Sequence, residues 1–330
     1  MYINKSFFKY EKIKQIDVNQ NVENPHLYNI DCVRLNREYE QNNTNLCWLT
    51  SSLTVLSCVP GCDFNISMSY FLFWHYIEKC NRLFNITAKQ KQYKCDRVVL
   101  NAGVDDSGDW NDFCFIIKKY GVVTNEQFNN NAYVENSARI NIILTRYCKI
   151  ICNKLLNDYN EALHKTALKN IYNFLATYLG NPTYIENLTL SKIYRKTIQD
   201  FTKIVNLQNN PEDNSFKTMQ SLIKQQLKNK IPVMIGVDSR HGLDFKNKIF
   251  KFNPKRIEAE IGLNILPSRD CGFSIGSLKI NHYLVVVGID QKNNIWKLWD
   301  NSRQNYILAE QRWINNYLFE AIIEKRLLSY

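Results

Sequence analysis

In Gln41-Asn42-Asn43-Thr44-Asn45-Leu46-Cys47-Trp48, a glutamine stands six residues ahead of a Cys-Trp pair. Behind the pair, Leu49, Leu53 and Leu56 recur at intervals of four and three residues and form one stripe along a helix. The spacing therefore predicts a helix that begins at Cys47. The thiol would lie in its first turn, near the positive end of the helix dipole.

A thiol in that position is a candidate nucleophile. Free thiols have a pKa of about 8.5, and a helix N-terminus together with a neighbouring imidazolium lowers that value. Gln41 can donate a side-chain N–H, beside the backbone N–H of Cys47, to the oxyanion that forms when a thiolate attacks a carbonyl. The alternative is structural: the chain has ten cysteines, and a buried cysteine usually serves as a small apolar side chain.

The partners of such a cysteine must come from the other half of the chain. Of the five histidines, only His282 directly precedes a long apolar strand pattern, and a second strand pattern over 295–299 ends in Asp300-Asn301-Ser302. The polar residues between the two patterns predict a hairpin turn, which brings His282 and Asn301 to the same end of an antiparallel pair. An imidazole oriented by an amide oxygen is the Cys-His-Asn version of a catalytic triad. Singly, His282 could be a strand-end histidine and Asn301 a turn residue, but the order Gln, Cys, His, Asn favours a site.

Further segments follow in a fixed order: Ser69-Tyr70-Phe71-Leu72-Phe73-Trp74, Gly108-Asp109-Trp110, Lys119-Tyr120-Gly121-Val122-Val123, Leu179-Gly180-Asn181-Pro182, Asn281-His282 and Asp300-Asn301-Ser302. With these motifs, the chain resembles the bleomycin hydrolase and aminopeptidase C branch of the papain-like cysteine peptidases. In that branch a large helical insertion separates the two catalytic halves. The separation of 235 residues between Cys47 and His282 agrees with this, since it exceeds the about 130 to 150 residues of ordinary papain-like enzymes.

The resemblance implies an α+β, papain-like fold with two lobes. Residues 1–40 would form an N-terminal arm, 41–134 the helical lobe with the nucleophile, 135–230 the helical insertion, and 231–330 the antiparallel β lobe. The implied activity is hydrolysis of peptide bonds in a peptide or protein substrate through a thioester acyl-enzyme, as an aminopeptidase or an endopeptidase. The implied catalytic residues are Cys47, His282, Asn301 and Gln41, and no cofactor or metal is expected.

Three departures from the family pattern bear on this expectation. Arg303 replaces the tryptophan that shields the His-Asn hydrogen bond in relatives, and Leu46 replaces the usual residue before the nucleophile. The chain ends at Tyr330, whereas relatives carry a longer tail that reaches into the cleft and restricts them to aminopeptidase action. A changed specificity is therefore expected. The alternative to an enzyme is an inactive homologue that acts as a binding protein.

The chain is basic, since 42 Lys and Arg residues against 31 Asp and Glu give a net charge of +11. This charge favours anionic partners and leaves weak nucleic-acid binding open, although the lysines are dispersed and no nucleic-acid-binding motif occurs. No apolar run approaches the about 18 residues of a membrane span, and the first residues lack a signal-peptide core. The expectation is a cytoplasmic protein without membrane contact. The resemblance leaves homo-oligomers open.

Other candidate sites are weaker. Gly272-Phe273-Ser274-Ile275-Gly276 fits the nucleophile elbow of serine hydrolases, but no acid lies between it and the only later histidine, His282. His241 is a rival base, but no strand pair with an amide partner follows it. The pairs Cys58/Cys62 and Cys148/Cys152 lack the two further ligands that a zinc site needs.

Overall fold

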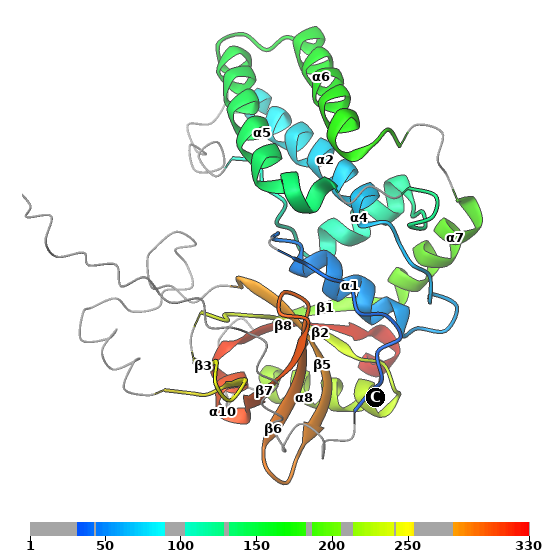
Figure 1. Ribbon diagram of the computed structural model, residues 1–330, viewed down its shortest axis with the longest axis vertical. Helices are drawn as coiled ribbons and strands as arrows, with labels where there is room; N and C mark the ends of the chain where they lie inside the picture. The colour runs from blue at the N-terminus through cyan, green and yellow to red at the C-terminus, as the bar shows by residue number, and fades with distance from the viewer. Residues whose placement is uncertain are drawn as a thin grey trace, which may run out of the picture.

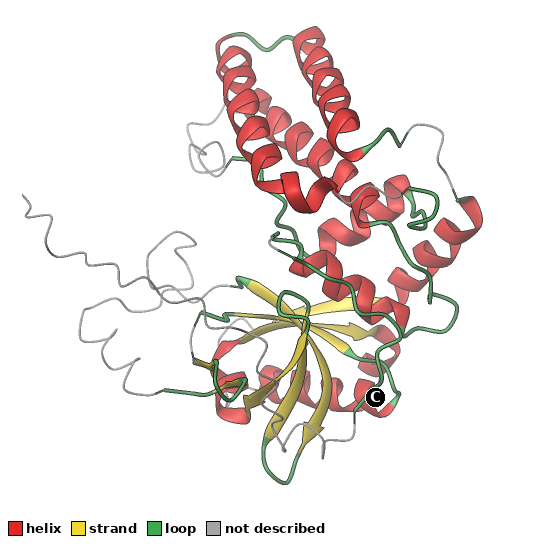
Figure 2. Ribbon diagram, viewed as in Figure 1, coloured by secondary structure: helices red, strands yellow, loops and turns green. Residues whose placement is uncertain are grey.

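The computed structural model describes residues 32–42, 44–89, 103–128, 132–182, 187–205, 214–240, 242–253 and 280–329. Most helices gather in one part of the molecule and the strands in another (Figure 2). The helix that begins at Cys47 lies between the two parts, against the sheet (Figure 1). The predicted α+β fold class is confirmed.

The helical part consists of α1 (Cys47–Ser57), α2 (Met68–Lys89), α4 (Trp110–Tyr120), α5 (Ala132–Asn157), α6 (Glu161–Leu179) and α7 (Leu188–Thr197). Helices α2, α5 and α6 pack along one another and project away from the sheet (Figure 1). Their apolar side chains join those of α1 in one core. No helix in the described ranges is both long and apolar enough to cross a membrane.

The strands form one sheet in the order β1-β8-β2-β5-β6-β7-β4-β3. Neighbouring strands run antiparallel, except that β4 and β7 are parallel. The strands are β1 (Phe201–Val205), β2 (Val233–Val237), β3 (Leu243–Asp244), β4 (Ile249–Phe250), β5 (His282–Asp290), β6 (Ile295–Asp300), β7 (Asn305–Glu310) and β8 (Leu318–Glu324). Around them lie α8 (Asn214–Lys228), α10 (Gln311–Tyr317) and the short helices η3 (Ile198–Asp200) and η4 (Lys325–Ser329).

The central strand β5 is buried on both faces. Val285 and Val287 belong to the core shared with α1, whereas Leu284 and Val286 belong to a second core with α8 and α10. Successive residues of a strand point to opposite faces, so burial on both sides explains the unbroken apolar run that predicts this strand. Helix α1 therefore covers one face of the sheet, and α8 and α10 cover the other.

The predicted helical insertion over 135–230 differs from the structure in its second half. Helices α5 and α6 project together with α2, but β1 pairs with β8 at the edge of the sheet, and α8 packs into the second core. The strand β1 has a single buried residue, Phe201, followed by partly or fully exposed ones. Its sequence therefore lacks the apolar run that identifies a central strand, and the sequence prediction of a helix over 201–205 is wrong.

Candidate active site

Cys47 and His282 meet where α1 crosses the sheet. Helix α1 begins at Cys47 and contacts β5, whose first residue is His282. The thiol and the imidazole form a side-chain hydrogen bond, and each residue is only 8% exposed. Leu46, at the N-cap, offers no side-chain acceptor to the N–H groups of the first turn. Those N–H groups remain available to an anion that forms beside the sulfur.

The surroundings of His282 favour its protonated form. Burial lowers the pKa of this imidazole, but the hydrogen bonds to Asp300 and Cys47 outweigh burial and raise it to about 9. The imidazole therefore carries its second proton at neutral pH. An imidazolium beside the sulfur is what a thiolate nucleophile requires.

Asp300, at the end of β6, is the residue that holds His282. The imidazole Nε2 donates to Asp300 Oδ1 over 3.0 Å. The same oxygen accepts from Ser302 N at 2.9 Å and Ser302 Oγ at 2.6 Å, and the other oxygen is paired with Arg303 Nη1. Burial on its own would raise the pKa of Asp300, but the hydrogen bond from His282 and the neighbouring Ser302 and Arg303 hold it well below its usual range.

Asn301 does not meet the expectation that it orients His282. Its Nδ2 donates to Thr54 Oγ1 on α1 at 3.4 Å, and its buried Oδ1 has no hydrogen-bond partner among the described residues. Adjacent residues at the end of a strand point in opposite directions. Asp300 is directed to His282, and Asn301 is directed to Thr54, seven residues beyond Cys47 in α1.

Gln41 lies in the loop that leads to the nucleophile and is buried. Its Nε2 donates to the carbonyl of Thr44, while its Oε1 has no hydrogen-bond partner in the described part of the chain. Its backbone N–H donates to the carbonyl of Asn301 at 3.1 Å. The loop is thus tied to the end of β6, beside the residues that surround His282, and Gln41 keeps a second side-chain N–H for another acceptor.

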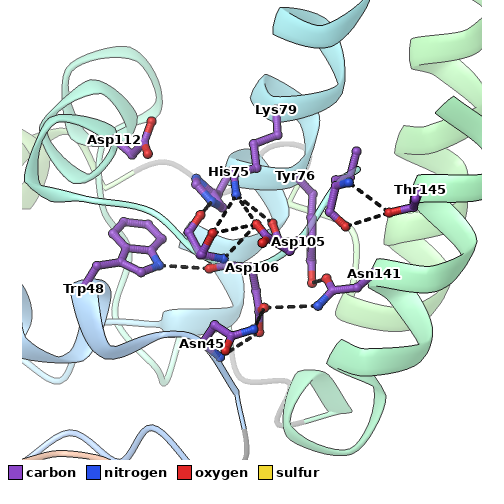
Figure 3. A network of polar contacts seen from close by, with 12 residues as sticks. Asn45, Trp48, His75, Tyr76, Lys79, Asp105, Asp106, Asp112, Asn141 and Thr145 are labelled. Atoms are coloured by element: carbon purple, nitrogen blue, oxygen red, sulfur yellow. Dashed lines mark hydrogen bonds and ion pairs between the residues drawn. The ribbon is translucent and has the colours of Figure 1, made fainter. Parts of the chain in front are cut away.

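A buried polar network supports the segment around Cys47 from the helical side (Figure 3). Asp106 is 1% exposed, and its carboxylate accepts from Asn45 N at 3.1 Å, from Asn45 Nδ2 at 2.9 Å and from Asn141 Nδ2 at 3.1 Å. Its backbone carbonyl accepts from Trp48 Nε1 at 2.9 Å. Asp106 therefore joins residues on both sides of Cys47 to α5. The sequence prediction missed it, although it stands two residues before the Gly108-Asp109-Trp110 motif.

The other candidates from the sequence lie away from Cys47 or outside the described residues. Residues 272–276 and His241 lie outside the described residues. Cys148 of α5 lies 3.5 Å from Cys80 of α2, sulfur to sulfur, inside the helical core, where both are fully buried. Cys58 and Cys62 follow α1. Neither pair lies at the site of Cys47.

Comparison with known proteins agrees with the geometry. The Peptidase C1-like family matches residues 5–210 and 194–330. The chain is 23% identical to Aminopeptidase E of Lactobacillus helveticus, over 88% of this chain and 81% of that protein. It is 22% identical to Bleomycin hydrolase of Gallus gallus, over 87% and 79%.

The fold has a match among solved structures. The crystal structure of PepW from Lactobacillus rhamnosis HN001 superposes with a TM-score of 0.69 at 19% identity, over 90% of this chain and 81% of that one. The papain-like fold with two lobes is thereby confirmed, as is the resemblance to the bleomycin hydrolase and aminopeptidase C branch. The chain belongs to the Peptidase C1-like family.

Proposed function

We propose that this protein hydrolyses peptide bonds with Cys47 as the nucleophile and His282 as the acid and base. The observation that carries the proposal is the buried hydrogen bond between the thiol at the start of α1 and an imidazole whose other side is held by a carboxylate. Nucleophile, base and orienting group in hydrogen-bond contact are the parts that covalent catalysis needs.

The reaction proceeds in two halves. The Cys47 thiolate attacks the carbonyl carbon of the peptide bond, and the His282 imidazolium gives its proton to the departing amine, which leaves a thioester on Cys47. The neutral imidazole then takes a proton from water, which attacks the thioester and releases the carboxylic acid. Each half passes through an oxyanion. The Cys47 backbone N–H, in the first turn of α1, and the side-chain amide of Gln41 are the donors proposed for it.

The substrate would lie between the two lobes. Gln41 and Cys47 come from the helical lobe and His282 from the β lobe, so a peptide must contact both to reach all three. Relatives named aminopeptidases favour removal of N-terminal residues, with endopeptidase action as the alternative. Aminoacyl amides with a free amine, compared with the same compounds acylated at that amine, separate the two. Preference for the free amine supports an aminopeptidase.

The pH dependence should report the state of His282. We expect kcat/KM to fall as pH rises through about 9, since the pKa of His282 is raised to about 9 and the proton for the leaving amine is lost above it. The sign follows from the imidazolium, which is the active form and exists only below this pKa. Initial rates measured across the neutral and alkaline range test this. An alkaline limb near the ordinary histidine pKa would contradict the protonated His282.

Selective alkylation offers a test that needs no known substrate. We expect iodoacetamide at about pH 6 to label Cys47 at least about tenfold faster than the other thiols, because the thiolate is the reacting form. Burial raises the pKa of Cys58 and of Cys114. Both are more exposed than Cys47, so a reaction governed by access alone would label them first. Peptide mapping by mass spectrometry at short times distinguishes the two outcomes.

A further inference from the structure

We infer that Asp300, and not Asn301, positions the catalytic imidazole, so that the site is a Cys47-His282-Asp300 triad with Arg303 as the counter-ion of the carboxylate. The inference rests on the proposed function, because it names the third member of that same site. It gives a role to Asp300, which contacts His282 where a Cys-His-Asn site has asparagine. It also gives a role to Arg303, which stands in place of the family's tryptophan and is paired with Asp300.

The strand register decides which of the two neighbours can reach His282. Val285 pairs with Trp299, and Val286 pairs with Leu298. Continuing this register by one residue puts Asp300 opposite Leu284. Residues opposite each other in an antiparallel pair share a face, as do residues two apart on one strand. Asp300 and His282 therefore share a face.

Asn301 lies just beyond the end of β6, in the turn to β7. Its Nδ2 donates to Thr54 Oγ1 of α1, seven residues after Cys47, so its side chain is held by α1 and not by His282. To reach His282, Asn301 would have to leave α1 and displace Asp300, which is fully buried.

The Asp300 carboxylate is held in place on every side. Besides His282 it accepts from both donors of Ser302 and is paired with Arg303, whose guanidinium also lies 5.9 Å from the ring centroid of Phe245. Arg303 offsets the cost of burying an ionised carboxylate. Because Asp300 occupies Nε2 of the imidazole, the ring presents its other nitrogen, Nδ1, to Cys47.

A carboxylate does more than an amide could at this place, since it stabilises the positive charge of the imidazolium as well as its orientation. Among the described residues, Cys47 of α1 and Asp300 of β6 face His282 directly, and Arg303 lies behind Asp300. On the other neighbouring strand, Val237 of β2 pairs with His282, and the next residue, Asp238, is paired with Arg240.

The test compares Asp300→Asn with Asn301→Ala in pH profiles of kcat/KM. We expect Asp300→Asn to lower kcat at least about tenfold with little change in KM, and to move the alkaline limb down by about one pH unit or more, because the imidazolium loses its anionic partner. Asn301→Ala should leave the alkaline limb where it is. If Asn301→Ala moves the limb and Asp300→Asn does not, Asn301 is the positioning residue and the inference is overturned.

A second readout covers a variant that folds poorly. In the proton NMR spectrum, the Nε2–H of His282 should give a strongly deshielded resonance that Asp300→Asn shifts upfield and Asn301→Ala preserves. The opposite pattern contradicts the triad. Thermal unfolding of each variant establishes that the folded protein is compared. Failure of the proposed function is separate: it would show as equal peptide hydrolysis by the wild type and Cys47→Ala, whatever the resonance does.

Discussion

Cys47→Ala abolishes peptide hydrolysis, with a fall in kcat/KM of about 10⁵-fold or more. The substitution removes the only atom that can form the thioester, and no other nucleophile touches His282 in the described residues. Little else should change, because alanine fits a site that is already mostly buried and apolar on the side of α1. Steady-state assays on aminoacyl and peptidyl amides measure the effect.

Cys58→Ala is the matched control, since it makes the same substitution just beyond the opposite end of α1. Cys58 contacts the carbonyls of Arg34 and Thr54 and lies away from His282. It should keep nearly full activity. Equal hydrolysis by the wild type and Cys47→Ala would instead identify the chain as an inactive homologue that binds peptides, and it would remove the proposed function.

Asp106→Ala is expected to cost about 2 kcal/mol of unfolding free energy. The variant removes three hydrogen bonds to a buried carboxylate, from the N–H and Nδ2 of the exposed Asn45 and from Nδ2 of the half-buried Asn141, and such bonds contribute about 1 kcal/mol each where water can reach the freed donors. The loss also frees the loop that precedes Cys47 (Figure 3). Activity at a temperature where the variant is folded should therefore fall as well.

Asp105→Ala is the control for the Asp106 variant. Its carboxylate is paired with Lys79, but that side chain is 48% exposed, and exposed pairs contribute about 1 kcal/mol or less. Urea unfolding of both variants, followed by circular dichroism, gives the two free energies. Equal losses would mean that the network around Asp106 does not hold the segment of Cys47.

The parts of this protein that local sequence predicts are those with a strong periodic or chemical pattern. The stripe behind Cys47 lies in α1, which begins at the predicted residue and is buried on all sides. The apolar run after His282 lies in β5, and the polar residues 291–294 form the turn to β6. Strand β1 was missed because an edge strand carries few buried residues, and its pairing with β8 joins segments far apart in the chain.

The role of Asp106 could not be predicted from the sequence for a different reason. Nothing in its neighbours marks it as more than a polar loop residue, because its partners Asn45 and Asn141 lie far away in sequence and on different elements. A buried acceptor can be recognised only when its donors have been brought to it.

The sequence by itself determined the family, the helix that presents Cys47, and the pairing of that cysteine with His282 at the end of a buried strand. For the third residue it predicted Asn301. Only the tertiary structure puts the neighbouring Asp300 against the imidazole instead, because side chains alternate across a sheet and the register of β5 against β6 places Asp300 and His282 on the same face. The register depends on how the whole sheet packs between α1 and α8, and a local sequence pattern cannot predict that packing.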